Sequence, residues 1–163
     1  MTESEQSFAT LLEKVKKLKA EGGVDLSTAE DLSLAVMNLI SLEEHFFFTG
    51  VKTGDKEYFD TGAEVREQRK ELLAKLIPDH EGETWCASKH LLSATMRLVE
   101  VGYKLEGDGK KEEAADMFKR AYKIYSVFWL LKLKLVAVGR VPAAPAGGKL
   151  EQIINELANC CDE

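Results

Sequence analysis

The stretch LSLAVMNLISLEEHFF, residues 32–47, has the apolar spacing of an amphipathic helix, with a carboxylate on its apolar side. On a helix that turns about 100° per residue, Glu43 falls in the middle of a face formed by Leu32, Val36, Leu39, Phe46 and Phe47. We therefore expect Glu43 to be a buried carboxylate. Desolvating a lone charge is costly, so a buried charge is usually paired. The stretch predicts a core helix and an internal polar cluster.

The next helical stretch offers the partner for this carboxylate. Arg69 lies on an apolar face with Arg66 at its edge, among Tyr58, Val65, Leu72, Leu73 and Leu76. One interpretation is a structural ion pair, in which the guanidinium of Arg69 neutralises Glu43 between adjacent antiparallel helices. The other is an anion-binding pocket formed by Arg66, Arg69 and Arg97, with Glu43 balancing the excess charge. The sequence leaves both open.

Outward from this stretch, helical segments alternate with short turns that contain glycine or proline. We expect helices at residues 5–21, 27–48, 55–77, 83–106, 111–138 and 149–159. Ser27-Thr28-Ala29-Glu30 has the pattern of a capping box, and Pro78 disfavours helix in the residue before it. The fold class predicted is all-α: an antiparallel bundle of four to five long helices with a short C-terminal helix.

Two parts of unequal size are expected along the chain. Residues 1–141 form the helical bundle. Residues 142–163 form a linker of small residues and a C-terminal helix that packs on the bundle or on a second subunit.

One segment, residues 95–128, has small and aromatic residues at a characteristic spacing: Gly102, Gly109, Glu113, Ala114, Phe118 and Ala121. At these positions the segment resembles a single tetratricopeptide unit. It departs from that family at Leu98, where the family has an aromatic residue, and at Ser126, where it has a proline. No second copy follows. The resemblance implies a tight helical hairpin and a role in protein interaction.

Cys86 and His90 are four residues apart, so they share one stripe of the helix expected at 83–106. If this stripe turns inward, they could bind one zinc or iron ion together with Glu43. A di-iron carboxylate site is not expected, because the chain has no Glu-x-x-His motif. The alternatives are a solvated stripe without function and a Cys-His nucleophile pair.

Composition and charge restrict the partners of the protein. The chain has 163 residues, 45% of them hydrophobic, and a formal net charge of -6. This suits one domain with a real core and disfavours nucleic acid as a partner. The polar and acidic start is unlike a secretory signal, so we expect a cytoplasmic protein.

The most apolar segment, residues 124–138, is too short to span a bilayer and contains Lys132 and Lys134, so a membrane role is not expected. It is apolar around nearly its whole circumference. We therefore expect a homodimer in which this helix and the C-terminal helix are covered by a second copy.

Two classes of function follow from these features. The first is a helical bundle with an internal polar site for a metal ion or a small anionic ligand, with no reaction assigned and enzymatic activity left open. Its ligand-binding residues would be Glu43, Arg66, Arg69 and Arg97. The alternative is a non-catalytic interaction or scaffold domain that binds a protein partner through its tetratricopeptide-like hairpin.

Overall fold

The computed structural model describes residues 10–11, 13–17, 20–21, 26–78 and 83–136. Four long helices account for most of these residues: α2 (Ser27–Thr53), α3 (Glu57–Leu76), α4 (Thr84–Gly107) and α5 (Lys111–Lys132). The described residues before α2 are also largely helical, and no strand occurs within these ranges. The all-α prediction is confirmed. The expected linker and C-terminal helix, within residues 142–163, lie outside the described residues.

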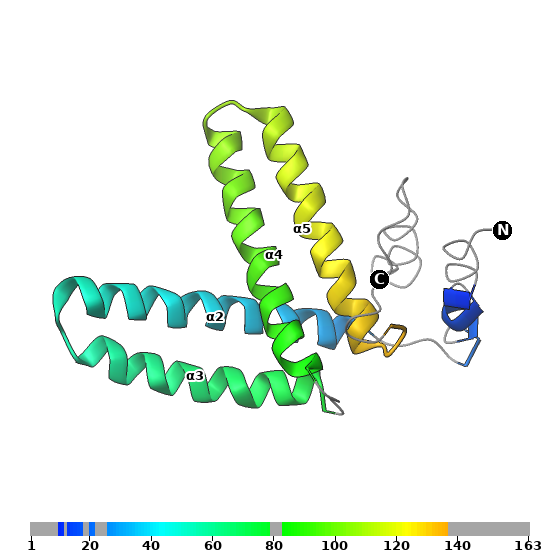
Figure 1. Ribbon diagram of the computed structural model, residues 1–163, viewed down its shortest axis with the longest axis horizontal. Helices are drawn as coiled ribbons and strands as arrows, with labels where there is room; N and C mark the ends of the chain where they lie inside the picture. Colours follow the sequence, from blue (N-terminus) through cyan, green and yellow to red (C-terminus); the bar gives the residue numbers. More distant parts are fainter. Residues whose placement is uncertain (1–9, 12, 18–19, 22–25, 79–82, 137–163) are drawn as a thin grey trace.

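The helices form two antiparallel hairpins, one of α2 and α3 and one of α4 and α5. The second hairpin lies across the first, and the closed tips of the two hairpins project away from the crossing (Figure 1). The hydrophobic core lies near the crossing, where the early part of α2 and the ends of α3 and α5 meet. Its buried members include Val15, Val36, Met37, Leu73, Leu76, Leu92, Phe128 and Leu130.

Three serines, Ser33 on α2, Ser88 on α4 and Ser126 on α5, are completely buried. Ser33 Oγ donates to the carbonyl of Glu30 at 2.7 Å and lies 2.6 Å from the hydroxyl of Tyr125. Because the single proton of Ser33 is used in the first bond, Tyr125 is the donor in the second. This contact joins α2 to α5 within the core.

Each hairpin is closed by a phenylalanine ring packed against a glycine. A Cβ at Gly50 of α2 would lie 2.8 Å from Cζ of Phe59 on α3, and a Cβ at Gly102 of α4 would overlap the ring of Phe118 on α5. A side chain at either position would require the ring to move. The tight hairpin implied by the tetratricopeptide resemblance is therefore present in α4 and α5.

Helix α2 differs from its prediction at both ends. No side-chain hydrogen bond caps its start, where Leu26 is the N-cap and Ser27 is already helical, so the predicted capping box is wrong. The helix also continues past residue 48 to Thr53. It ends at Gly54, which has φ 72° and donates its N–H to the carbonyl of Gly50.

Helix α5 ends at Lys132, six residues before the predicted end. Lys134 adopts a left-handed backbone with φ 54°, and the N–H of Leu135 bonds the carbonyl of Leu130 at 2.9 Å. This is the hydrogen bond of a Schellman ending. The side chain of Leu135 is buried, so burial of this residue in the core accompanies the end of the helix.

The apolar segment of α5 is covered by the chain itself. Residues 128–131 are all buried, and Lys132 Nζ donates to the carbonyl of Leu76 at the end of α3 at 2.9 Å. The part of this segment that is buried within one copy needs no second subunit to cover it. The predicted homodimer through this segment and the C-terminal helix, which lies outside the described residues, stays a prediction. No described helix has the length and apolar character required to cross a membrane.

Candidate functional site

Glu43 and Arg69 form a two-point ion pair between α2 and α3. Arg69 Nε donates to Oε1 of Glu43 at 2.7 Å, and Arg69 Nη2 donates to Oε2 at 3.2 Å. The side chain of Arg69 is 8% exposed and that of Glu43 is 13% exposed. The predicted pairing is confirmed, because the apolar faces of two adjacent antiparallel helices place both groups at one level.

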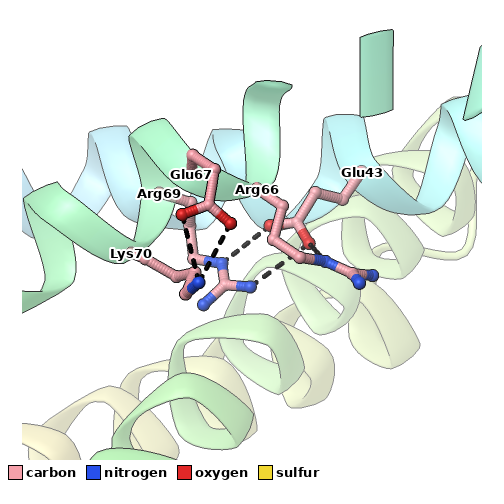
Figure 2. A network of polar contacts seen from close by, with 5 residues as sticks. All are labelled: Glu43, Arg66, Glu67, Arg69 and Lys70. Atoms are coloured by element: carbon pink, nitrogen blue, oxygen red, sulfur yellow. Dashed lines mark hydrogen bonds and ion pairs between the residues drawn. The ribbon is translucent and has the colours of Figure 1, made fainter. Parts of the chain in front are cut away.

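Arg66, one turn before Arg69 on α3, adds a second guanidinium to the same carboxylate. Its Nε donates to Oε2 of Glu43 at 3.0 Å, although most of its side chain is exposed. Figure 2 shows the two arginines converging on Glu43 and, beside them, Lys70 bonded to Glu67. Both Nη groups of Arg66 lie outside the bonds to Glu43.

The two guanidiniums fix the charge of Glu43. Burial by itself would raise the pKa of this carboxyl, but the hydrogen bonds from Arg69 and Arg66, together with their charges, lower the pKa below its ordinary value. Glu43 is thus held as a carboxylate whose oxygens already accept hydrogen bonds. This makes it a fixed counter-charge and a poor general base at neutral pH.

A pocket of about 450 Å³ opens beside this cluster, at the corner where α4 crosses the α2–α3 hairpin. Its lining combines basic and apolar side chains around one carboxylate: Ile40, Glu43, Arg66, Arg69, Lys70, Trp85 and Lys89. Helix α3 supplies three of the cations and α4 supplies the fourth. The arrangement places several hydrogen-bond donors for an anion beside two apolar side chains, one of which is an indole.

The prediction that Arg66, Arg69 and Arg97 converge on one pocket is wrong for Arg97. Arg97 does not line the pocket; its Nε lies 3.5 Å from Oε2 of Glu44, in a pair that is about half exposed. Glu43 and Glu44 are neighbours on a helix, so their side chains point about 100° apart. One carboxylate faces α3 and the other pairs with α4, and this divides the arginines between them.

The expectation that Cys86 and His90 turn inward is also wrong. Both side chains are exposed, and neither lines the pocket that contains Glu43. In the described part of the chain, no three His, Cys, Asp or Glu side chains are grouped so as to hold a metal ion. The stripe of α4 that faces the pocket is the adjacent one, which contains Trp85 and Lys89.

Four pocket residues were not singled out from the sequence: Ile40, Lys70, Trp85 and Lys89. A signal for two of them exists, because Trp85 and Lys89 have the same four-residue spacing as Cys86 and His90, one position earlier. Trp85 and Lys89 would have been identified if the inward face of α4 had been placed one residue earlier in the sequence. Lys70 directly follows Arg69 and lies one turn beyond Arg66, so it extends the same basic stripe.

Comparison of the chain with protein-family models, curated proteins and solved structures finds no match. The tetratricopeptide resemblance therefore gains no support from a family model.

Proposed function

We propose that this protein binds a small anionic ligand in the pocket between α2, α3 and α4. The observation that carries the proposal is the presence of four basic side chains around one cavity that contains a single carboxylate. Like charges brought together cost free energy in the empty protein. A bound anion would offset that cost and would receive charge-assisted hydrogen bonds.

The roles of the lining residues follow from their contacts. Arg69 donates two hydrogen bonds to Glu43, so it forms part of the wall of the site. Arg66 gives only its Nε to Glu43, which leaves its outer Nη groups for a ligand. Lys89 comes from α4 whereas the other three cations come from α3, so it would hold an anion from a different helix.

Binding of inorganic phosphate tests the proposal. Isothermal titration of the full chain at low ionic strength should give a Kd of about 1 mM or tighter. Arg66→Gln and Lys89→Gln should each weaken binding about tenfold. The matched controls are Arg120→Gln and Lys123→Gln, two exposed residues of α5 outside the pocket, and these should bind as the unchanged protein does. Absence of binding, or equal losses in the α5 variants, would refute a specific site.

A second candidate, a protein-interaction domain, is favoured by a different surface. At the tip of the α2–α3 hairpin four apolar residues, Phe47, Phe48, Val51 and Phe59, are 42% to 61% exposed. Phe47 contacts the rings of Phe48 and Phe59 edge-on at centroid distances of 5.4 and 6.5 Å. Apolar groups clustered in this way are typical of contact surfaces.

If the partner is a second copy of the chain, this second candidate function can be tested directly by measuring self-association. If the tip pairs two copies of the chain, sedimentation equilibrium should show a dimer that the double variant Phe47→Ser with Phe48→Ser converts to a monomer. A chain that is monomeric throughout the micromolar range would refute the homodimer. The phosphate titration is independent of this result, because the tip residues do not line the pocket.

A further inference from the structure

The pocket is larger than a bare anion needs, and its lining has two chemically different parts. Its volume of about 450 Å³ is within the usual range of sites for small organic molecules. Arg66, Lys70 and Lys89 give the charged part. Ile40 and Trp85 give an apolar part.

The charge balance of the pocket indicates how much negative charge a ligand should bring. Four cations line the cavity. Glu43 neutralises one of them, and Glu67, bonded to Lys70 Nζ at 2.9 and 3.1 Å, neutralises another. Two positive charges remain. A phosphate monoester carries nearly two negative charges at neutral pH, whereas a carboxylate or a sulfate ester carries one.

Trp85 and Lys89 lie one helical turn apart on the same stripe of α4. Side chains at this spacing have Cβ atoms about 5–6 Å apart. A group that rests on the indole is therefore within a short covalent distance of a phosphate held by the ammonium group. The indole offers a planar surface on which an aromatic ring can stack.

On the basis of the proposed function, we infer that the ligand is a phosphate monoester that also carries a flat aromatic group. Arg66 and Lys89 bind the phosphate, and Trp85 stacks on the ring. Two sources share this chemistry, a nucleotide and an aryl phosphate such as that of tyrosine.

Four probes test this inference on the full chain by isothermal titration: phenyl phosphate, glycerol 3-phosphate, phenyl sulfate and inorganic phosphate. Phenyl phosphate should bind at least about tenfold more tightly than glycerol 3-phosphate, which has the charge without the ring. It should also bind at least about tenfold more tightly than phenyl sulfate, which has the ring with one charge fewer. The affinities of adenosine 5′-monophosphate and O-phosphotyrosine are then compared, and the compound that binds more tightly identifies the source.

Variants connect the preference to the indole. In Trp85→Leu the ratio of the glycerol 3-phosphate Kd to the phenyl phosphate Kd should fall close to one. Tyr103→Leu, which removes an exposed ring of α4 outside the pocket, should keep the ratio of the unchanged protein. If Trp85→Leu does not fold, the ratios measured on the unchanged protein still decide.

The outcomes separate this inference from the proposed function. Equal affinity for glycerol 3-phosphate and phenyl phosphate, or for phenyl sulfate and phenyl phosphate, overturns the aromatic monoester and leaves the anion site in place. Failure of all probes, inorganic phosphate included, overturns the anion site itself.

Discussion

Arg69 binds both carboxylate oxygens of Glu43, with Nε 2.7 Å from Oε1 and Nη2 3.2 Å from Oε2, and thereby joins α3 to α2 beside the crossing of the two hairpins. The side chains of Arg69 and Glu43 are largely buried. Arg66, whose side chain is mostly exposed, donates a hydrogen bond to Oε2 of Glu43. The pair is at once a structural contact between helices and one wall of the pocket. Its energetics can therefore be measured separately from ligand binding.

Replacing Arg69 by Met should destabilise the protein by about 3 kcal/mol, because it leaves Glu43 desolvated with only Arg66 as partner. Adding Glu43→Leu to Arg69→Met should recover much of that loss. Urea denaturation of the four proteins in the cycle gives the coupling energy. Arg97→Met, which breaks the exposed pair with Glu44, is the matched control and should cost less than about 1 kcal/mol. Strictly additive losses for Glu43 and Arg69 would contradict a direct interaction.

Stability should fall in acid partly through Glu43. The pKa of this carboxyl in the folded protein is below its ordinary value of 4.5, so the unfolded chain binds the proton more readily. Its contribution is therefore fully present above about pH 5 and is lost as the pH falls through the lowered folded pKa. Glu43→Gln lacks this contribution. The difference in unfolding free energy between the unchanged protein and Glu43→Gln should become smaller as the pH is lowered from about 5 to about 3. A constant difference over that range would exclude this role.

Introducing a methyl group at Gly102 should loosen the α4–α5 hairpin, because the new Cβ would overlap the Phe118 ring. We expect Gly102→Ala to destabilise by about 1–2 kcal/mol, although alanine is the better helix former. Gly107→Ala is the matched control: it lies in the same helix with nothing within 4 Å of its Cβ, and it should be neutral or slightly stabilising. The loss at Gly102 should disappear when measured in a Phe118→Leu background. Its persistence there would mean that the ring is not the cause.

The exposed thiol of Cys86 should react with a bulky thiol reagent at the rate of an unprotected cysteine. The measurement is best made with Cys160 and Cys161 changed to Ser, so that Cys86 is the single thiol left in the chain. Saturating phosphate should leave the rate unchanged, because Cys86 does not line the pocket. Slow labelling that a chelator accelerates would instead restore the metal hypothesis for Cys86 and His90.

The sequence by itself determined the helices and one internal contact. Apolar residues at helical spacing predicted an all-α chain, and charged residues in the middle of two such faces predicted the Glu43–Arg69 pair. Both follow from local periodicity, because residues three and four apart share a face whatever the rest of the chain does. The small residues of the α4–α5 hairpin are a local signal of the same kind.

Only the tertiary structure decided which stripe of α4 meets the pocket and which carboxylate each arginine takes. Trp85 and Lys89 line the pocket while Cys86 and His90 face solvent, a difference of one residue in the rotation of α4. That rotation depends on how the second hairpin packs across the first, through buried contacts such as Ser33 with Tyr125, which are far apart in the sequence. The early end of α5 has the same origin, because Leu135 is buried in a core formed by other helices. Periodicity determines the faces of a helix, and packing between distant segments determines what each face meets.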